Sequence, residues 1–319
     1  MKVNLERFSA YQGTGWKARA GSLASELSRL DAPRVNSEYR PLKAVLLYCP
    51  GRELLAVKNP NAAQHLRRIS PALIRREYAG ITAAFRKEGV EVHLLPGATR
   101  PGRGPALNLM YVRDLFFNTT EGAVAARMAS EVRAGEEGLA AAALTGLGVP
   151  INKSVSGTGT FEGADALWLD KKTVLCGTGT RTNEEGFFQL RRVLAAQGVR
   201  TLEVRLPGGV QHLLGLLQIV DRDLALLRAG KASAAVKAVL RGHKINFIPV
   251  PESEEVTSRQ GMNIVTVAPR RIIMPAGCPG LKKLYLDSGL SVAAEVGISQ
   301  LVNGAGGLAC ATGILSRSI

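Results

Sequence analysis

Four residues with reactive or charged side chains recur at nearly regular intervals along this 319-residue chain: Asp114, Glu162, His212 and Cys310. The first three are separated by 48 and 50 residues, and Cys310 follows His212 by 98 residues, which is close to two further intervals. Each lies in or beside an apolar segment typical of a buried strand. If each interval is one unit of a ring-like repeat, the four side chains converge on a common axis.

A pocket lined by these four side chains could modify a guanidinium group. Two carboxylates can bind this planar cation through charge-assisted hydrogen bonds, each worth roughly 1.5–3 kcal/mol. A cysteine thiolate above the plane could attack the central carbon, while a histidine protonates the leaving amine and later accepts a proton from water. Because burying such groups together is costly, their convergence would indicate a function.

Each residue taken alone also has a structural interpretation, which the sequence leaves open. His212 could be a hydrogen-bonded core histidine, and Cys310 a small buried apolar residue. Asp114 or Glu162 could cap a turn. The recurrence of all four at one interval favours the functional interpretation.

The segments between these residues predict a repeated unit of strand, strand, helix and strand. Four hairpins are predicted, with turns near residues 120, 171, 222 and 269, a period of about 50 residues. A helix with apolar residues at helical spacing follows, such as Phe187, Leu190 and Leu194, and then another strand.

Radial closure of such units leaves few sheet edges exposed. We therefore expect one α/β domain over residues 43–319, a five-bladed propeller with approximate fivefold symmetry. An α+β enzyme with accidental spacing is the alternative. Residues 1–42 lack the pattern and are predicted to form an N-terminal leading arm.

The composition excludes several other classes of protein. The net charge is +15, but aromatic residues are only 5% and no basic stretch is interleaved with them, so nucleic-acid binding is a minor hypothesis. No apolar run reaches the roughly 18–20 residues of a membrane span, and the first residues do not resemble a signal peptide. A cytoplasmic protein without membrane contact is expected.

The cysteines and histidines do not form a metal-binding or disulfide pattern. Four widely spaced cysteines contain no C-x-x-C pair, and no two of the four histidines have ligand-like spacing. Neither a metal nor another cofactor is predicted. His65, His93 and His243 are interpreted as surface or turn residues.

From about Leu42 to its C-terminus, the sequence resembles the guanidino-group-modifying superfamily (penteins), which includes arginine deiminase, dimethylarginine dimethylaminohydrolase and the amidinotransferases. Several segments carry the resemblance in the same order: AVLLYCPGREL, N-x4-RD at 108–114, FEGAD at 161–165, GTGTRTNEEG at 177–186, GGVQHLLG around His212, and GGLACATGILSR. The resemblance implies a five-bladed α/β propeller that binds a small guanidino substrate.

The same resemblance implies roles for individual residues. Cys310 matches the nucleophile and His212 the general acid and base, while Asp114 and Glu162 match the carboxylates that bind the guanidinium. Asn108 matches a substrate-binding amide, and two arginines, each nineteen residues after a carboxylate, match residues that bind the substrate α-carboxylate. The full set expected to bind or surround the substrate is Asn108, Arg133, Arg181, Asp165 and Leu214.

One departure from the arginine deiminase pattern bears on specificity. These enzymes usually carry an acidic residue two positions after the histidine, whereas this chain has Leu214. Loss of the carboxylate fits the dimethylaminohydrolase pattern, in which a substituted guanidine nitrogen needs apolar space. The leading hypothesis is therefore hydrolysis of L-arginine or an N-substituted L-arginine through a covalent cysteine intermediate.

Two alternatives remain open from the sequence. In an amidinotransferase an amine, instead of water, would resolve the covalent intermediate. A basic binding protein that keeps the fold without catalysis would show salt-dependent binding to nucleic acid. The sequence also leaves the oligomeric state open, a homo-oligomer included.

Overall fold

The computed structural model describes residues 4–97, 99–100 and 102–319, and the chain divides into two compact units, residues 1–32 and 33–319. The smaller unit contains helix α1 (Leu23–Arg29) and two short 3-10 turns, Leu5–Arg7 and Ser9–Tyr11. The division falls ten residues before the predicted end of the arm. Residues 33–42 belong to the larger unit because Glu38 is buried there and accepts a hydrogen bond from Arg113 (3.0 Å).

Five three-stranded sheets form the larger unit, and each includes one helix in its connection. Along the chain they are β17–β1–β2 (Gly313–Arg317, Leu42–Leu47, Glu91–Leu94) with α2 (Pro71–Lys87); β5–β6–β7 (Phe116–Asn118, Ala123–Ala125, Ile151–Ser154) with α3 (Glu136–Gly146); β8–β9–β10 (Ala166–Asp170, Thr173–Thr178, Arg200–Arg205) with α4 (Glu184–Ala196); β11–β12–β13 (Leu217–Asp221, Leu224–Leu227, Asn246–Pro249) with α5 (Ala234–Gly242); and β14–β15–β16 (Val265–Ala268, Arg271–Pro275, Ser291–Val296) with α7 (Pro279–Asp287).

The remaining strands and α-helices are short connections: β3 (Thr99–Arg100), β4 (Gly104–Pro105), α6 (Glu254–Thr257), α8 (Ser299–Asn303) and α9 (Leu308–Ala311). Every three-stranded sheet has the same pairing: its first strand is antiparallel to the second, and the second is parallel to the third. The predicted α/β fold of strand–strand–helix–strand units is confirmed.

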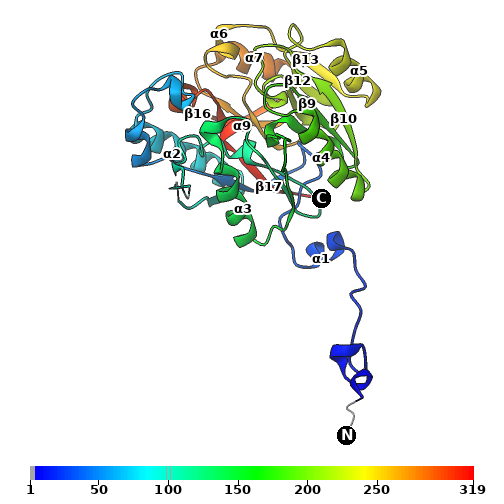
Figure 1. Ribbon diagram of the computed structural model, residues 1–319. Helices are drawn as coiled ribbons and strands as arrows, with labels where there is room; N and C mark the ends of the chain where they lie inside the picture. Colours follow the sequence, from blue (N-terminus) through cyan, green and yellow to red (C-terminus); the bar gives the residue numbers. More distant parts are fainter. Residues whose placement is uncertain (1–3, 98, 101) are drawn as a thin grey trace. The chain divides into compact units, whose positions relative to one another are not determined.

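The first sheet joins the two ends of the larger unit. Strand β17, at the C-terminus, pairs with β1, so Val45 lies opposite Ile314. In Figure 1 the red strand β17 accordingly lies inside the larger unit. The first strands of neighbouring sheets also contact one another, β17 with β5 and β11 with β14. Residues far apart in sequence are thereby brought to the same ends of adjacent strands.

Helix α4 shows how the local sequence sets these elements. The Asn183 side chain caps the helix by accepting a hydrogen bond from the backbone of Gly186 (2.9 Å). Phe187, Leu190 and Leu194 are buried on one face, as their spacing predicts. The helix therefore covers its sheet and leaves the connecting loops free to carry functional residues.

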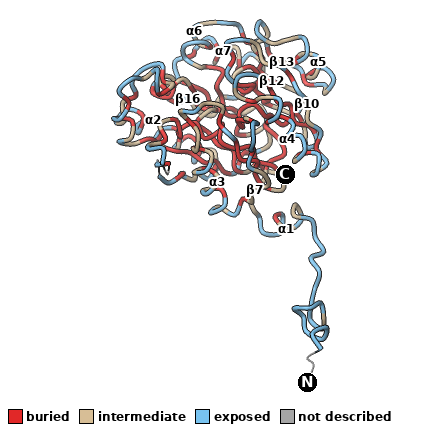
Figure 2. Tube along the Cα trace, in the orientation of Figure 1, coloured by how far each residue is buried: buried red, intermediate tan, exposed pale blue. Residues whose placement is uncertain are grey.

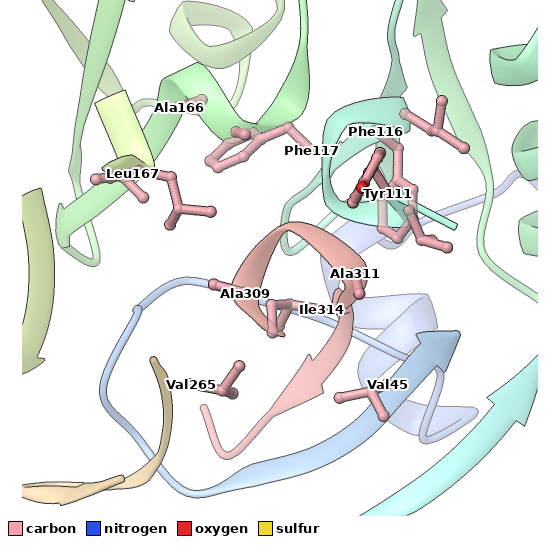
Figure 3. Close-up of a cluster of buried hydrophobic side chains, with 14 of the residues drawn as sticks. Val45, Tyr111, Phe116, Phe117, Ala166, Leu167, Val265, Ala309, Ala311 and Ile314 are labelled. Atoms are coloured by element: carbon pink, nitrogen blue, oxygen red, sulfur yellow. The ribbon is translucent and has the colours of Figure 1, made fainter. Parts of the chain in front are cut away.

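The hydrophobic core lies between the sheets of the larger unit. Figure 2 shows buried residues in the middle of this unit, whereas its outer helices and loops carry many exposed ones. In Figure 3, Ala309 and Ala311 of α9 lie within a cluster that includes Val45, Val265 and Ile314. No helix of the described residues is both long and apolar enough to span a bilayer.

Candidate active site

The four spaced residues occupy equivalent places in four of the five repeats, each of which consists of one three-stranded sheet and its helix. Asp114 lies in a 3-10 turn just before β5, Glu162 precedes the turn leading to β8, and His212 precedes the turn leading to β11. Cys310 lies in α9, just before β17. Each short turn ends where the first strand of a sheet begins, so the repeat places these side chains at corresponding strand ends.

Close backbone packing holds two of these turns together. A Cβ atom on Gly163 would lie 2.0 Å from the carbonyl oxygen of Phe116 and 2.7 Å from that of Arg113. Only glycine permits this approach, which places Glu162 beside the turn that carries Asp114. Close packing against this neighbouring turn therefore explains why the FEGAD segment has a glycine at position 163.

His212 binds Glu162 and faces Asp114. Its Nε2 is 2.7 Å from Oε2 of Glu162, and its Nδ1 is 3.9 Å from Oδ1 of Asp114. Burial lowers the pKa of His212, but the charges of Asp114 and Asp165 and the bond to Glu162 outweigh burial and raise it to about 9. The imidazole is therefore protonated at neutral pH and can donate a proton.

Glu162 stays ionised although it is fully buried. Burial alone would raise its pKa, but the hydrogen bond and charge of His212, together with the charges of Arg133 and Arg181, hold this pKa below the usual range. Oε1 of Glu162 also accepts a hydrogen bond from the backbone of Ala129 (3.2 Å). The carboxylate is thus fixed by both oxygens.

Asp165 lies behind this pair, fully buried and bonded to protein groups. It accepts hydrogen bonds from the hydroxyl of Thr182 (2.7 Å) and the backbone of Leu213 (3.0 Å). Burial raises the pKa of Asp165 to about 7. Because Leu213 follows His212, these bonds position the turn that carries the imidazole.

Asp114 has one oxygen committed to the protein and one that is free among the described residues. Its Oδ2 accepts a hydrogen bond from Arg133 (2.6 Å), whereas Oδ1 is buried without a hydrogen-bond partner there. A buried carboxylate oxygen without a donor is costly. Oδ1 can therefore accept a hydrogen bond from a cationic ligand.

Cys310 presents its thiol beside these charged groups. Burial raises the pKa of Cys310 to about 11 and the negative charge of Asp114 contributes, against hydrogen bonds from the Gly307 backbone and the Asn263 side chain. The thiol is neutral in the ligand-free site. A bound cation would favour the thiolate, so substrate binding can activate the nucleophile.

Two adjoining cavities meet at Cys310 and His212. A narrow cavity of about 30 Å³ is lined by both residues together with Asn108, Asp114, Arg133 and Arg181. A wider cavity of about 200 Å³ is lined by both residues and by the apolar side chains of Val210, Leu214, Val256 and Met262. One side of the thiol is therefore polar and charged, and the other combines these apolar side chains with the polar groups of Gln211, Arg228 and Gln260.

The two arginines predicted to bind a carboxylate have different surroundings. Arg133 is 4% exposed and donates hydrogen bonds to Asp114, Glu136 and the carbonyls of Asn108 and Tyr111. Arg181 is partly exposed, and its NH1 is 3.6 Å from Oε1 of Glu162. Arg181 retains donors for a ligand, whereas Arg133 holds Asp114 in place.

The predicted amide, Asn108, lines the narrow cavity but is also tied to the protein. Its side-chain nitrogen donates to the carbonyl of Ala63 (2.9 Å), and its backbone nitrogen donates to Glu136 (3.0 Å). Leu214 is buried and lines the wider cavity. All the predicted residues are thus gathered around the thiol or directly behind its neighbours.

The structure corrects one interpretation and adds residues that the sequence did not single out. His65 was interpreted as a surface or turn residue, but it is buried with only 3% exposed, and burial lowers its pKa. Glu136, Gln211 and Asn263 were not predicted. Glu136 binds Arg133, Gln211 lines both cavities and Asn263 contacts Cys310.

The described residues include one cluster with metal-like donor spacing: Asp114, Glu162 and His212, whose donor atoms lie within 4.8 Å of one another. Arg133 and the protonated imidazole already pair with these carboxylates. A metal ion would have to displace the hydrogen bond between His212 and Glu162. The cluster therefore fits the binding of an organic cation better than that of a metal ion.

Comparisons with known proteins agree with this architecture. The sequence profile of the arginine deiminase family matches residues 104–225. An uncharacterized protein of Aeropyrum pernix is 29% identical over 188 residues, which cover 59% of this chain and 65% of that protein, just under two thirds of its length.

Solved structures resemble the chain over most of its length. A dimethylarginine dimethylaminohydrolase adduct is 25% identical, with a TM-score of 0.69 over 87% of this chain and 100% of the other. The Pseudomonas aeruginosa enzyme, solved with citrulline, gives 23% and 0.68 with the same coverage. The N-terminal domain of a cyanobacterial arginine dihydrolase gives 18% and 0.72 over 86% and 98% of the chains.

Proposed function

This chain belongs to the guanidino-group-modifying (pentein) superfamily, and we propose that within it the protein hydrolyses a C–N bond at the guanidine carbon of L-arginine or an N-substituted L-arginine. The observation that carries the proposal is the meeting at one cavity of a thiol, a protonated imidazole and a carboxylate, one oxygen of which accepts no hydrogen bond from the described residues. Cys310, His212 and Asp114 supply these groups from three different units.

In the first step, the Cys310 thiol releases its proton to solvent when the cationic substrate binds, and the resulting thiolate attacks the guanidinium carbon and forms a C–S bond. The C–N bond to the leaving amine then breaks, and this amine takes its proton from His212. Asp114 and Glu162 stabilise the positive charge of the substrate before attack. The product of this half-reaction is an amidino group bound covalently to the cysteine.

In the second step, water attacks the bound amidino carbon and His212 accepts the proton of that water. The C–S bond breaks, which returns the thiol and releases a ureido product. Arg181 binds the α-carboxylate of the substrate, because it is the partly exposed arginine of the narrow cavity. Arg133 instead keeps the carboxylate of Asp114 oriented.

A substrate panel tests this proposal directly. L-Arginine, N-methylated arginines, agmatine and guanidino acids are incubated with the enzyme, and ammonia, amine and urea are measured. Release of ammonia or amine together with a ureido product supports hydrolysis. Absence of any change in all these guanidines would exclude the proposed function.

Transfer of the amidino group to an amine is the second candidate, and the wider cavity beside Cys310 favours it because an acceptor amine could enter there. The two reactions differ in what resolves the covalent intermediate. Repeating the panel with and without glycine or another primary amine separates them. Turnover that requires the amine indicates transfer, whereas turnover in its absence indicates hydrolysis.

Replacing Leu214 by aspartate is expected to shift specificity toward unsubstituted arginine. The carboxylate can accept hydrogen bonds from an unsubstituted NH2 group, but it is an unfavourable neighbour for an alkyl group. The ratio of kcat/KM for L-arginine to that for an N-methylated arginine should rise about tenfold or more, equivalent to about 1.4 kcal/mol. Leu214→Asn is the control for size and polarity without charge, and an equal ratio in the two variants would contradict the prediction.

We expect kcat/KM to depend on pH as it does when the active protonation state, a thiolate beside an imidazolium, is only a small fraction of the enzyme. The active form needs the thiolate of Cys310 and the imidazolium of His212, whose pKa values are about 11 and about 9. Below pH 9, kcat/KM should therefore rise about tenfold per pH unit, then level off and fall again above about 11. Stopped assays from pH 6 to 11 measure the rise and the plateau of this profile. A plateau that begins near pH 6.5 would contradict it.

A further inference from the structure

The regular spacing of the site has a fifth member that the chemistry of the other four does not require. Asn263 follows His212 by 51 residues and precedes Cys310 by 47, so it divides the double interval between them. It lies two residues before β14, the first strand of the remaining sheet. In the fifth repeat of sheet and helix, Asn263 thus occupies the position that the reactive side chains occupy in the other four repeats.

The carboxamide of Asn263 contacts both the backbone and the thiol of the nucleophile. Its Oδ1 accepts hydrogen bonds from the backbone nitrogens of Ala309 (2.6 Å) and Cys310 (3.2 Å). Its Nδ2 donates to Sγ of Cys310 at 3.2 Å. Because two N–H donors fix the oxygen, the amide nitrogen must face the sulfur.

Close packing leaves this side chain little freedom. Asn263 is 5% exposed, and a Cβ atom on Gly307 would lie 2.6 Å from its Cγ. Gly307 has an extended backbone (φ −140°) that any residue can adopt. The glycine at this position therefore provides space for Asn263 and is not required by its own backbone conformation.

We propose, on the basis of the proposed function, that Asn263 positions the nucleophile: its oxygen fixes the backbone turn that carries Cys310, and its N–H group stabilises the thiolate that attacks the guanidine carbon. The hydrogen bond from this N–H group to the sulfur strengthens when the sulfur becomes negatively charged. The two hydrogen bonds that the oxygen accepts hold α9, a four-residue helix, at the start of β17. One side chain thus aims the sulfur and favours its reactive form.

The variant Asn263→Asp separates these two roles. An aspartate keeps an oxygen that accepts the two backbone bonds, but it lacks the N–H group and adds a negative charge beside the sulfur. At a given pH, a smaller fraction of Cys310 should therefore be present as the thiolate, while the fold is retained. The rate of alkylation of Cys310 by iodoacetamide at pH 8, followed by mass spectrometry of the peptide that contains Cys310, should fall at least about tenfold.

Turnover should respond in the same direction. The kcat of Asn263→Asp should fall by at least about tenfold with KM changed by less than about threefold, and the pH at which alkylation is half-maximal should rise. Gly307→Ala, which leaves the carboxamide chemically intact but displaces it, should also slow alkylation. The matched control is Asn118→Asp, another buried amide whose side chain binds the carbonyl of Leu315 and not the thiol.

Alkylation of Asn263→Asp at the wild-type rate and pH dependence would overturn the inference. So would an equal change in Asn118→Asp, because the effect would then reflect general destabilisation, which the thermal midpoint of each variant also monitors. Alkylation requires no turnover of a guanidine. If the wild type turns over no guanidine, the proposed function is refuted. If alkylation of Cys310 is nevertheless slower in Asn263→Asp, the effect of Asn263 on the thiol is still established.

Discussion

Replacing Cys310 by alanine is expected to lower kcat for the best guanidine substrate by at least about 10⁴-fold, or about 5.5 kcal/mol in activation free energy. The reason is that no covalent intermediate can form without the sulfur, whereas the binding groups of the cavity remain. Substrate should therefore still bind with an affinity within about tenfold of the wild type. Steady-state kinetics and calorimetric titration measure the two quantities separately.

The same experiment has a direct chemical readout. Acid quenching of the wild-type enzyme during turnover should trap the amidino adduct, and mass spectrometry should place its added mass on Cys310. Cys49→Ala is the matched control, because Cys49 is the other partly exposed cysteine of the chain and does not line either cavity at His212. Substantial turnover by Cys310→Ala, or an adduct on Cys49, would refute the mechanism.

The local sequence was sufficient to predict most of the fold. Hairpins such as Ala166–Asp170 with Thr173–Thr178 have apolar strands on both sides of a short polar turn, and this local pattern repeats four times. The sheet that contains β1 could not be recognised in the same way. Its first strand, β17, lies at the other end of the chain, so its pairing depends on tertiary packing and not on a local turn.

The boundary of the N-terminal arm shows a similar limit. Residues 33–42 contain no periodic apolar pattern, yet Glu38 pairs with Arg113 (3.0 Å) and accepts a hydrogen bond from the backbone of Trp168 (3.2 Å). Both partners lie far along the chain. Burial through such polar contacts leaves no periodic signal in the sequence.

In the site, spacing predicted which residues meet but not what each donor does. Arg133 and Arg181 have the same nineteen-residue offset from a carboxylate, and this offset predicts one role for both. Glu136, in the first turn of α3, makes the difference because it binds Nε of Arg133 at 2.8 Å and leaves that guanidinium fully used. No feature of the arginines themselves records this neighbour.

Asn263 was missed for a different reason. The spacing of about 50 residues points to a position near it, but the side chains that mark the other positions are ionisable or nucleophilic, and an amide is neither. An amide carries no charge and is common in turns. Its importance lies in the direction of its two polar atoms, one toward the backbone of Cys310 and the other toward the sulfur.

Glu162→Gln is expected to lower kcat/KM by about 10³-fold, or about 4 kcal/mol. The variant keeps the size of the side chain but removes one of the negative charges that maintain His212 as an imidazolium. The pKa of His212 should therefore fall below its value of about 9, so that the rise of kcat/KM with pH ends at a lower pH. Assays of the variant across pH 6–11 measure this change.

The stability of the protein should change with it, and the sign follows from the raised pKa of His212. A histidine with a pKa of about 9 when folded and about 6.5 when unfolded stabilises the fold fully below pH 6.5 and loses that contribution as the pH rises to 9. In Glu162→Gln this alkaline loss, a few kcal/mol in the wild type, should shrink. Denaturant titrations at pH 6 and pH 9.5 measure this loss of stability.

Glu38→Gln is the control, because Glu38 is a buried carboxylate that pairs with Arg113 and lines neither cavity at Cys310. This variant should reduce stability at both pH values alike. An unchanged alkaline loss in Glu162→Gln would mean that this carboxylate does not hold the proton on His212.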